Sequence, residues 1–295
     1  MIDPSFLNQL NKLNLILKRR VSNAYAGGRA SIQYGRGIEP VDHREYIRGD
    51  DLRLVDWKLY GRTERLYIRR FEEEKSMILH LLVDASASMD FQNSPATSIK
   101  KFDYAGSLAT GFAYLSVHEN EKFSAALFSS KLGDVMAPDK SKKHLFTMID
   151  VMNKTPLSGV TDFSTAANQF AKTIRSKSFA VVISDFLAPL DSIEEGVYRM
   201  AKASEELMVI QVLDPSEINL AWTDDIHFED LETKESARTY LSPKFKEEYK
   251  HMVAEHIARL QRICNEVGIS FNLITTDMPL LDAFVGLIGG AKRGT

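Results

Sequence analysis

Asp84, Ser86 and Ser88 occupy alternate positions of the string "VDASASMDF", directly after the apolar run "MILHLLV". Carboxylate and hydroxyl oxygens that converge in one loop are ligands suited to a hard divalent cation such as Mg²⁺. Aspartate and serine also close turns and cap helices through side-chain bonds to the backbone. The string alone therefore leaves a cation-binding loop and an ordinary turn both open.

Two later loops carry oxygen-bearing side chains of the same kind. Thr161 and Asp162 lie in "SGVTDFSTA", before a helix-like run, and Asp185 follows the apolar run in "VVISDFL". Thr161 or Asp162 can instead cap the helix that follows, and Asp185 can be a turn residue. Because ligands of open α/β sheets bind beyond the carboxyl ends of the strands, we expect these loops to meet at the rim that also carries Asp84.

Apolar runs of strand length alternate with runs of helix length from residue 78 onward. This alternation predicts an α/β domain with a mostly parallel central sheet and helices on both faces. The string "LGDVMAP" predicts a short antiparallel strand at the sheet edge, and residues 214–243 predict a β-hairpin insertion. The expected strands are 78–83, 123–130, 178–184, 207–213 and 269–275, and the expected helices are 99–118, 141–153, 163–175, 192–205 and 244–267.

The N-terminal part of the chain differs in charge from the rest. Residues 1–70 carry 14 Lys/Arg against 8 Asp/Glu, a net charge of +6, which leaves −9 for residues 71–295. Apolar residues at helical spacing over residues 5–20 predict an amphipathic helix. We therefore expect an accessory segment of helical and β structure, residues 1–75, that packs on an α/β domain formed by residues 76–295.

The string "REYIRGDDLRLVDW", Arg44–Trp57, combines arginines and aspartates at short spacing. We expect Arg44, Arg48, Arg53 and Asp56 to form bidentate ion pairs that fasten the basic segment to the acidic domain. Trp57 is then a packing anchor. A binding site made by the same side chains is the alternative, and we favour the structural interpretation because such pairs are often architectural.

The composition is that of a globular protein: 295 residues, 44% hydrophobic and 26% charged. No stretch reaches the roughly 18 uninterrupted apolar residues that span a bilayer, and the N-terminus lacks the basic-then-apolar layout of a secretory signal. The single cysteine, Cys264, is expected to be a buried small hydrophobe. We therefore expect a cytoplasmic protein without an integral membrane segment.

Charge and histidine patterns argue against two other classes of partner. The signs of charge alternate through the basic segment and no aromatic-interleaved basic stripe accompanies them, so we expect no nucleic-acid partner. The seven histidines include no HExxH string or other zinc pattern, and we expect them at the surface.

The D-x-S-x-S string, the threonine loop and the later aspartate together resemble the metal-ion-dependent adhesion site (MIDAS) of von Willebrand factor A domains, which have a Rossmann-like fold. The resemblance implies that a cation, Mg²⁺ or Mn²⁺, is surrounded by Asp84, Ser86, Ser88, Thr161 and Asp185. It also implies that the hydroxyls contact the cation directly, whereas the aspartates act partly through water. The T-D-G string common in that family is here Ser184-Asp185-Phe186.

Upstream, "GRGIEPVDHREYIRGDDLRLVDWKLYGRTERLYIRRFEEE" is similar to the signature of the bacterial domain-of-unknown-function family fifty-eight, whose members are often encoded beside MoxR-type AAA+ ATPases. The similarity extends from about Gly35 through Asp185. It implies a non-enzymatic adaptor that works with such an ATPase in the assembly or activation of client proteins. A carboxylate of the ATPase or of the client then completes the coordination of the cation.

A Mg²⁺-dependent phosphohydrolase with Asp84 as nucleophile is the alternative function, because such enzymes also place an aspartate after the first parallel strand. The string typical of those enzymes is D-x-D, and its second aspartate is replaced here by Ser86. The sequence also has no Gly-rich Walker string for nucleotide hydrolysis. We therefore expect a metal-dependent protein-interaction domain rather than an enzyme.

Overall fold

The computed structural model describes residues 34–72, 77–92, 99–175, 178–220, 225–229, 236–240 and 242–290. The chain divides into two compact units, Ala26–Ser76 and a larger unit made of Met1–Tyr25 with Met77–Thr295. The helix expected over residues 5–20 lies outside the described residues. The expectation that residues 1–75 pack on the α/β domain stays a prediction.

The larger unit is built on a six-stranded sheet with the order β10-β7-β6-β3-β4-β5. The first five strands in this order are parallel, and β5 pairs antiparallel with β4 at one edge. The predicted α/β class with a mostly parallel sheet is therefore confirmed. The strands are β3 (Ile78–Asp84), β4 (Phe123–Phe128), β5 (Met136–Asp139), β6 (Ser178–Ser184), β7 (Glu206–Leu213) and β10 (Ser270–Thr275).

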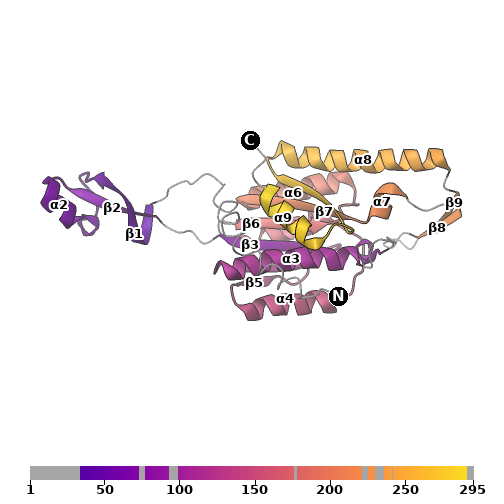
Figure 1. Cartoon of the computed structure of the whole chain (residues 1–295), viewed down its shortest axis with the longest axis horizontal. Coiled ribbons are helices and arrows are strands. Elements are labelled where there is room, and N and C mark those ends of the chain that lie inside the picture. Colours follow the sequence, from indigo (N-terminus) through magenta and orange to yellow (C-terminus); the bar gives the residue numbers. More distant parts are fainter. Residues whose placement is uncertain are drawn as a thin grey trace. The chain divides into compact units, whose positions relative to one another are not determined.

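Helices cover both faces of this sheet (Figure 1). Leu79, Leu81 and Val83 of β3 pack into one hydrophobic core with α3, α4 and α9, while Leu82 packs into a second core with α5, α6 and α8. A strand points successive side chains to opposite faces, so an apolar strand such as β3 needs both layers to be buried. The helices are α3 (Lys101–His118), α4 (Lys142–Lys154), α5 (Phe163–Ala171), α6 (Leu190–Ala203), α8 (Pro243–Glu266) and α9 (Leu280–Gly290).

The parallel register brings the ends of the central strands to one rim. Val83 of β3 lies opposite Ile183 of β6, and Asp84 lies opposite Phe128 of β4. The residues that follow β3 and β6 in the sequence therefore emerge side by side. The 3-10 helix η2 (Ala87–Asp90) follows β3 at this rim.

Residues 214–243 contain a short helix, α7 (Pro215–Asn219), and two strands, β8 (Asp225–Glu229) and β9 (Ser236–Tyr240). The two strands pair antiparallel with each other in a sheet of their own. No helix in the described part of the chain is both long and apolar enough to cross a membrane.

The smaller unit has its own two-stranded antiparallel sheet of β1 (Tyr34–Glu45) and β2 (Tyr67–Glu72), with the 3-10 helix η1 (Leu52–Leu54) and the helix α2 (Trp57–Thr63) between them. Asp56 is the N-cap of α2, and its Oδ1 accepts from the backbone N–H groups of Lys58 and Leu59 at 3.0 Å each.

Two of the arginines expected to form ion pairs around Arg44–Trp57 pair with neighbouring aspartates of this unit, whereas Asp56 lies 3.0 Å from His43 instead of an arginine. That the segment is fastened to the α/β domain stays a prediction. Arg44 Nη2 lies 2.6 Å from Asp50 Oδ1, and Arg53 Nη2 lies 2.8 Å from Asp51 Oδ2. These pairs stabilise the turn between β1 and α2. Trp57 is 61% exposed, so it is not packed inside this unit, and its role as an anchor stays a prediction.

One histidine departs from the expectation of a surface position. His80 of β3 is 4% exposed, and neither ring nitrogen has a hydrogen-bond partner among the described residues. Its ring packs edge-on against Phe170 of α5. Burial lowers the pKa of His80 to about 4, from the ordinary value of 6.5, because the charged imidazolium cannot be solvated there.

This burial predicts an acid-sensitive fold. The unfolded chain binds a proton at His80 near pH 6.5 and the folded chain does not until about pH 4, so the stability that His80 supports is present above pH 6.5 and is lost as the pH falls towards 4. The loss amounts to about 1.4 kcal/mol per pH unit in this window. Between pH 6.5 and 5, His80→Leu should therefore lose about 2 kcal/mol less free energy of unfolding than the wild type in urea titrations.

The matched control is Leu82→Val, a substitution in the same strand and the same core that removes no titratable group, which should leave the pH dependence as it is in the wild type. Equal slopes for the wild type and His80→Leu would show that the imidazole is protonated or solvated in the folded state.

Candidate metal centre

Asp84 is the centre of the polar cluster at the rim. It is fully buried at the end of β3. Its Oδ1 accepts from the backbone N–H of Ser86 at 2.9 Å, and its Oδ2 accepts from Ser184 Oγ at 2.6 Å and from Thr161 Oγ1 at 3.4 Å. Each of these donors is neutral, so the described contacts satisfy the oxygens of Asp84 without neutralising its charge.

Ser86 and Ser88 lie in the loop that η2 shapes. Ser86 is the N-cap of η2 without a side-chain cap bond, so its hydroxyl is not used to hold the helix. Ser86 Oγ lies 3.0 Å from Ser88 Oγ. Two oxygens bound side by side to one Mg²⁺ at about 2.1 Å in an octahedron are about 3.0 Å apart. The two hydroxyls therefore have the separation that one edge of a Mg²⁺ coordination octahedron requires.

Thr161 reaches the cluster because its loop is bonded to the loop after β3. The Ser158 N–H donates to Ala85 O at 3.3 Å, and the Ala87 N–H donates to Gly159 O at 3.1 Å. Gly159 has φ +86°, a conformation that favours glycine. Thr161 itself is 6% exposed. These two bonds hold the loop of Thr161 against the loop that follows β3.

Asp162 has the capping role that the sequence left open. Its side chain accepts from the Thr165 N–H at 3.1 Å, as the N-cap of α5. Thr161 thus faces the cluster and Asp162 faces the helix. The alternative in which Thr161 caps α5 is wrong.

Asp185 lies at the same rim, but its carboxylate is directed to a cation of the protein itself. Its Oδ2 accepts from Lys101 Nζ at 2.8 Å, and its Oδ1 accepts from the Leu187 N–H at 3.3 Å. Lys101 Nζ also donates to Glu217 Oε1 at 2.6 Å. Lys101 is fully buried, and Asp185 is 1% exposed.

The structure therefore joins Asp84, Ser86, Ser88 and Thr161 by hydrogen bonds, and it adds three residues that the sequence did not single out. These are Ser184, Lys101 and Glu217. A signal for Lys101 exists in the sequence, because it stands four and seven residues before Ala105 and Leu108 on the apolar face of α3. Glu217 belongs to the capping box of α7, and no pattern in the sequence indicates its contact with Lys101.

Burial and neighbouring charge shape the electrostatics of the cluster. Burial, together with the charge of Asp185, raises the pKa of Asp84 to about 7. Burial opposes the charge of Lys101, but the carboxylates of Asp185 and Glu217 outweigh burial and raise the lysine pKa above its usual range. Burial also raises the pKa of Glu217, against the charge of Lys101. The raised pKa of Lys101 requires an ionised Glu217, whereas the raised pKa of Glu217 favours its neutral form. We take Lys101 and Glu217 as an ion pair, because the two groups are hydrogen-bonded at 2.6 Å.

The donor set suits a small hard cation. It offers three neutral hydroxyls and one buried carboxylate whose charge lacks a cationic partner among the described residues, and all four are oxygen ligands of the kind that Mg²⁺ and Mn²⁺ accept. In the described part of the chain there is no group of three or more His, Cys, Asp or Glu side chains placed to hold a metal ion. A cation here would depend on hydroxyl ligands, and its binding stays a prediction.

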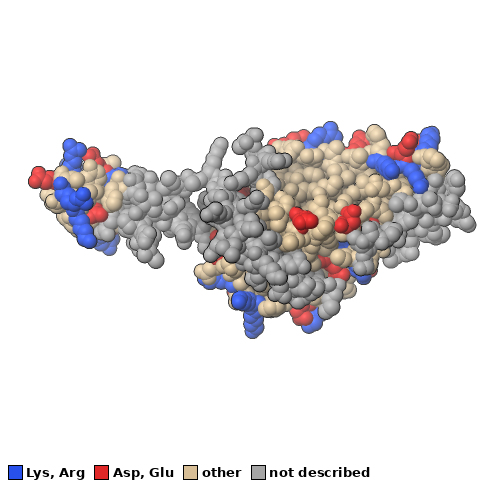
Figure 2. Space-filling view, viewed as in Figure 1, with Lys and Arg blue, Asp and Glu red and all other residues tan. Residues whose placement is uncertain are grey.

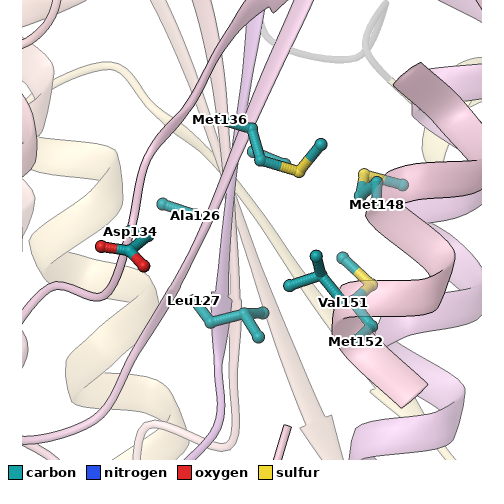
Figure 3. A pocket seen from close by; sticks show the side chains of 8 residues that line it. Ala126, Leu127, Asp134, Met136, Met148, Val151 and Met152 are labelled. Atoms are coloured by element: carbon teal, nitrogen blue, oxygen red, sulfur yellow. The ribbon is translucent and has the colours of Figure 1, made fainter. Parts of the chain in front are cut away.

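A pocket between β4, β5 and α4 is lined by three methionines, Met136, Met148 and Met152 (Figure 3). Its volume is ≈ 20 Å³, about enough for one water molecule. On the face shown in Figure 2, uncharged residues cover much of the α/β unit and charges of both signs are scattered around them.

Phe186 stands where the related strings have glycine, and its backbone adopts the left-handed conformation that glycine favours, with φ 49°. The strain costs a non-glycine residue about 1–2 kcal/mol. Three contacts hold it: the Phe186 N–H donates to Ser184 Oγ at 2.9 Å, His256 Nε2 lies 2.7 Å from Phe186 O, and the ring packs against Phe163. The phenylalanine ring fills the core on the side of α5.

Comparison with known proteins places the sequence in a family. Residues 42–259 match the family described as "Protein of unknown function DUF58". An uncharacterized protein of Mycobacterium tuberculosis is 26% identical over 99% of this chain and 92% of that protein. The structure of the conserved hypothetical protein BatB from Bacteroides thetaiotaomicron covers 72% of this chain and 99% of that chain, with 11% identity and a TM-score of 0.47. The structure of the SpRpn10 VWA domain covers 72% of this chain and 96% of that chain, with 13% identity and a TM-score of 0.45.

The conformation of Phe186 predicts an unusual order of stabilities. Phe186→Ala should lower the free energy of unfolding by about 3–5 kcal/mol through the lost ring. Phe186→Gly should be more stable than Phe186→Ala by about 1 kcal/mol, because only glycine is free of the left-handed strain. Urea unfolding of the three proteins measures both differences.

Phe170 supplies the control, because it is equally buried but lies inside α5. There the glycine variant should be less stable than the alanine variant by about 0.5–1 kcal/mol. The same order at both positions would show that residue 186 does not hold the left-handed conformation.

Proposed function

We propose, from the premise that this chain belongs to the DUF58 family, that it is a metal-dependent protein-interaction module rather than an enzyme. The observation that carries the proposal is the cluster of three hydroxyls around the buried carboxylate of Asp84, with Ser86 Oγ and Ser88 Oγ 3.0 Å apart. The cation would be Mg²⁺ or Mn²⁺. Asp84, Ser86, Ser88 and Thr161 would hold it, with Asp185 in support.

The chemistry of the ligands explains why such a cation would bind a partner. Hydroxyls are neutral, so three of them leave most of the charge of a divalent cation uncompensated. Mg²⁺ takes six oxygens and exchanges its waters reluctantly, so a position not filled by the protein accepts an anionic oxygen in preference to a neutral one. A carboxylate of a partner protein is the most direct source of that oxygen.

The residue at position 86 favours binding over the phosphohydrolase alternative. Ser86 supplies a hydroxyl where such an enzyme would have the second carboxylate that acts as acid and base.

The partner we propose is a MoxR-type AAA+ ATPase together with a client protein that the pair assembles or activates. The support is the resemblance of Arg44–Trp57 to the family signature and the match over residues 42–259, which includes parts of both compact units. An ATPase of this kind works where ATP is available, so we place the encounter in the cytoplasm. A partner carboxylate bound to the cation would be the contact that depends on the cluster.

Binding of Mg²⁺ to the folded state should raise thermal stability. At a hundredfold excess over the Kd the gain is about 2.7 kcal/mol, since the unfolded chain lacks the site. For a protein of this size we expect a rise in Tm of about 5–10 °C in the wild type and little rise in Ser88→Ala or Asp84→Asn. Differential scanning calorimetry with Mg²⁺, with Mn²⁺ and with chelator measures it.

Ser164→Ala is the matched control, because its hydroxyl lies in the first turn of α5 and contacts Glu195 instead of Asp84. It should respond to Mg²⁺ as the wild type does. An equal rise in the wild type and in both site variants would place the cation elsewhere on the protein.

Loss of one hydroxyl at the cluster should weaken partner binding. A charge-assisted, partly desolvated contact is worth on the order of 2–5 kcal/mol, or a roughly 30- to several-thousand-fold change in Kd. With a purified MoxR-type ATPase from the same organism, calorimetric titration should show such weakening for Thr161→Ala and not for Ser164→Ala. The variants are the decisive arm, since a chelator would also remove the Mg²⁺ that the ATPase needs for its nucleotide. Binding that survives Thr161→Ala would place the interface outside the cluster.

A further inference from the structure

Lys101 is a buried cation beside the cluster, and the proposed function does not use it. It is the first residue of α3, and its ammonium is 2.8 Å from Asp185 Oδ2 and 2.6 Å from Glu217 Oε1. The ring of Phe91, which directly follows η2, lies with its centroid 5.7 Å from Nζ. Burying a lysine is costly unless it is paired, so its position is set by these two carboxylates.

Backbone groups hold both carboxylates in place. Asp185 Oδ1 accepts from the Leu187 N–H, and Glu217 Oε2 accepts from the Asp214 N–H at 2.8 Å. In addition, Gln211 Nε2 donates to Asp185 O at 2.8 Å. Neither carboxylate can turn towards the cluster without breaking one of these bonds. The ammonium is therefore a fixed charge next to the cluster.

The two aspartates of the rim differ in how their charges are met. Asp185 has a direct cationic partner, whereas the described partners of Asp84 are all neutral donors. The two residues are nevertheless close, because Ser184, the neighbour of Asp185 in the sequence, bonds to Asp84. A divalent cation at Ser86 and Ser88 would thus lie near a second positive charge, and like charges repel.

We propose that Lys101 is a positioning residue that keeps Asp185 out of direct contact with the cation and weakens cation binding at the cluster. This inference rests on the proposed function. Its consequence is that the site alone binds the cation loosely. The carboxylate of a partner would then supply the negative charge that Lys101 takes from Asp185, so cation and partner would bind cooperatively.

Two variants should change cation affinity in opposite directions. Lys101→Met removes the repelling charge and frees Asp185, so Mn²⁺ should bind at least tenfold more tightly. Glu217→Gln leaves the ammonium less compensated, so Mn²⁺ should bind severalfold more weakly. The Kd for Mn²⁺ is measured by the electron paramagnetic resonance signal of the free ion, on the full chain. A lysine with a purely structural role would not make Mn²⁺ binding tighter when it is removed.

Lys101→Met leaves two buried carboxylates without their cation and can fail to fold. The double variant Lys101→Met/Glu217→Gln removes one of those charges and should still bind Mn²⁺ more tightly than the wild type. Lys100→Met is the matched control, because this adjacent lysine is exposed and pairs with Asp90 at the surface. It should change the Kd by less than twofold.

The outcomes separate the inference from the proposed function. A wild type that binds no Mn²⁺, or that binds it equally well after Ser88→Ala, overturns the proposed function itself. A wild type that binds Mn²⁺ through Ser88, with equal or weaker binding in the folded Lys101 variants, overturns the role of Lys101 alone. If neither Lys101 variant folds, Glu217→Gln decides, and unchanged or tighter binding there counts against the inference.

Discussion

The burial of the Asp84 carboxylate is the constraint on which the rim of this protein depends. A carboxylate without water must be satisfied by the protein, and here its donors come from three separate segments: the loop after β3, the loop before α5 and the end of β6. Each of those three segments donates one hydrogen bond to Asp84. The Thr161 hydroxyl both donates to the carboxylate and belongs to the ligands that we propose for the cation, so folding and binding share this group.

Charge is distributed unevenly around that carboxylate. Lys101 lies between Asp185 and Glu217 on the side of α3 and α7, while the described partners of Asp84, on the side of η2 and the threonine loop, are all neutral donors. The ion pairs of Lys101 link α3, the end of β6 and the capping box that begins α7. The start of the segment that carries the β8–β9 hairpin is therefore tied by ion pairs to the residues of the rim.

Phe186 has a left-handed backbone at the rim although it is not a glycine. It directly follows the contact that satisfies the carboxylate, because Ser184 Oγ bonds both to Asp84 and to the Phe186 N–H. Phenylalanine accepts the strain because its ring is 1% exposed in the core between α5 and β6. In the smaller unit, by contrast, two arginines find carboxylate partners within a few residues, Arg53 with Asp51 and Arg44 with Asp50. Local pairs of this kind stabilise a turn.

The sequence by itself determined the α/β class and most of the elements, because the spacing of apolar residues that distinguishes strands from helices is a local pattern along the chain. It also brought Asp84, Ser86 and Ser88 together, since a short loop after a strand leaves them no room to separate. The burial of His80, the exposure of Trp57 and the charges around Asp185 could not be predicted in this way. Lys101 meets Asp185 across 84 residues and Glu217 across 116, and Ser184 meets Asp84 across 100. Periodicity tells which face of an element is buried, but the strand order and the register of the sheet decide which buried groups touch, and those are properties of the tertiary structure alone.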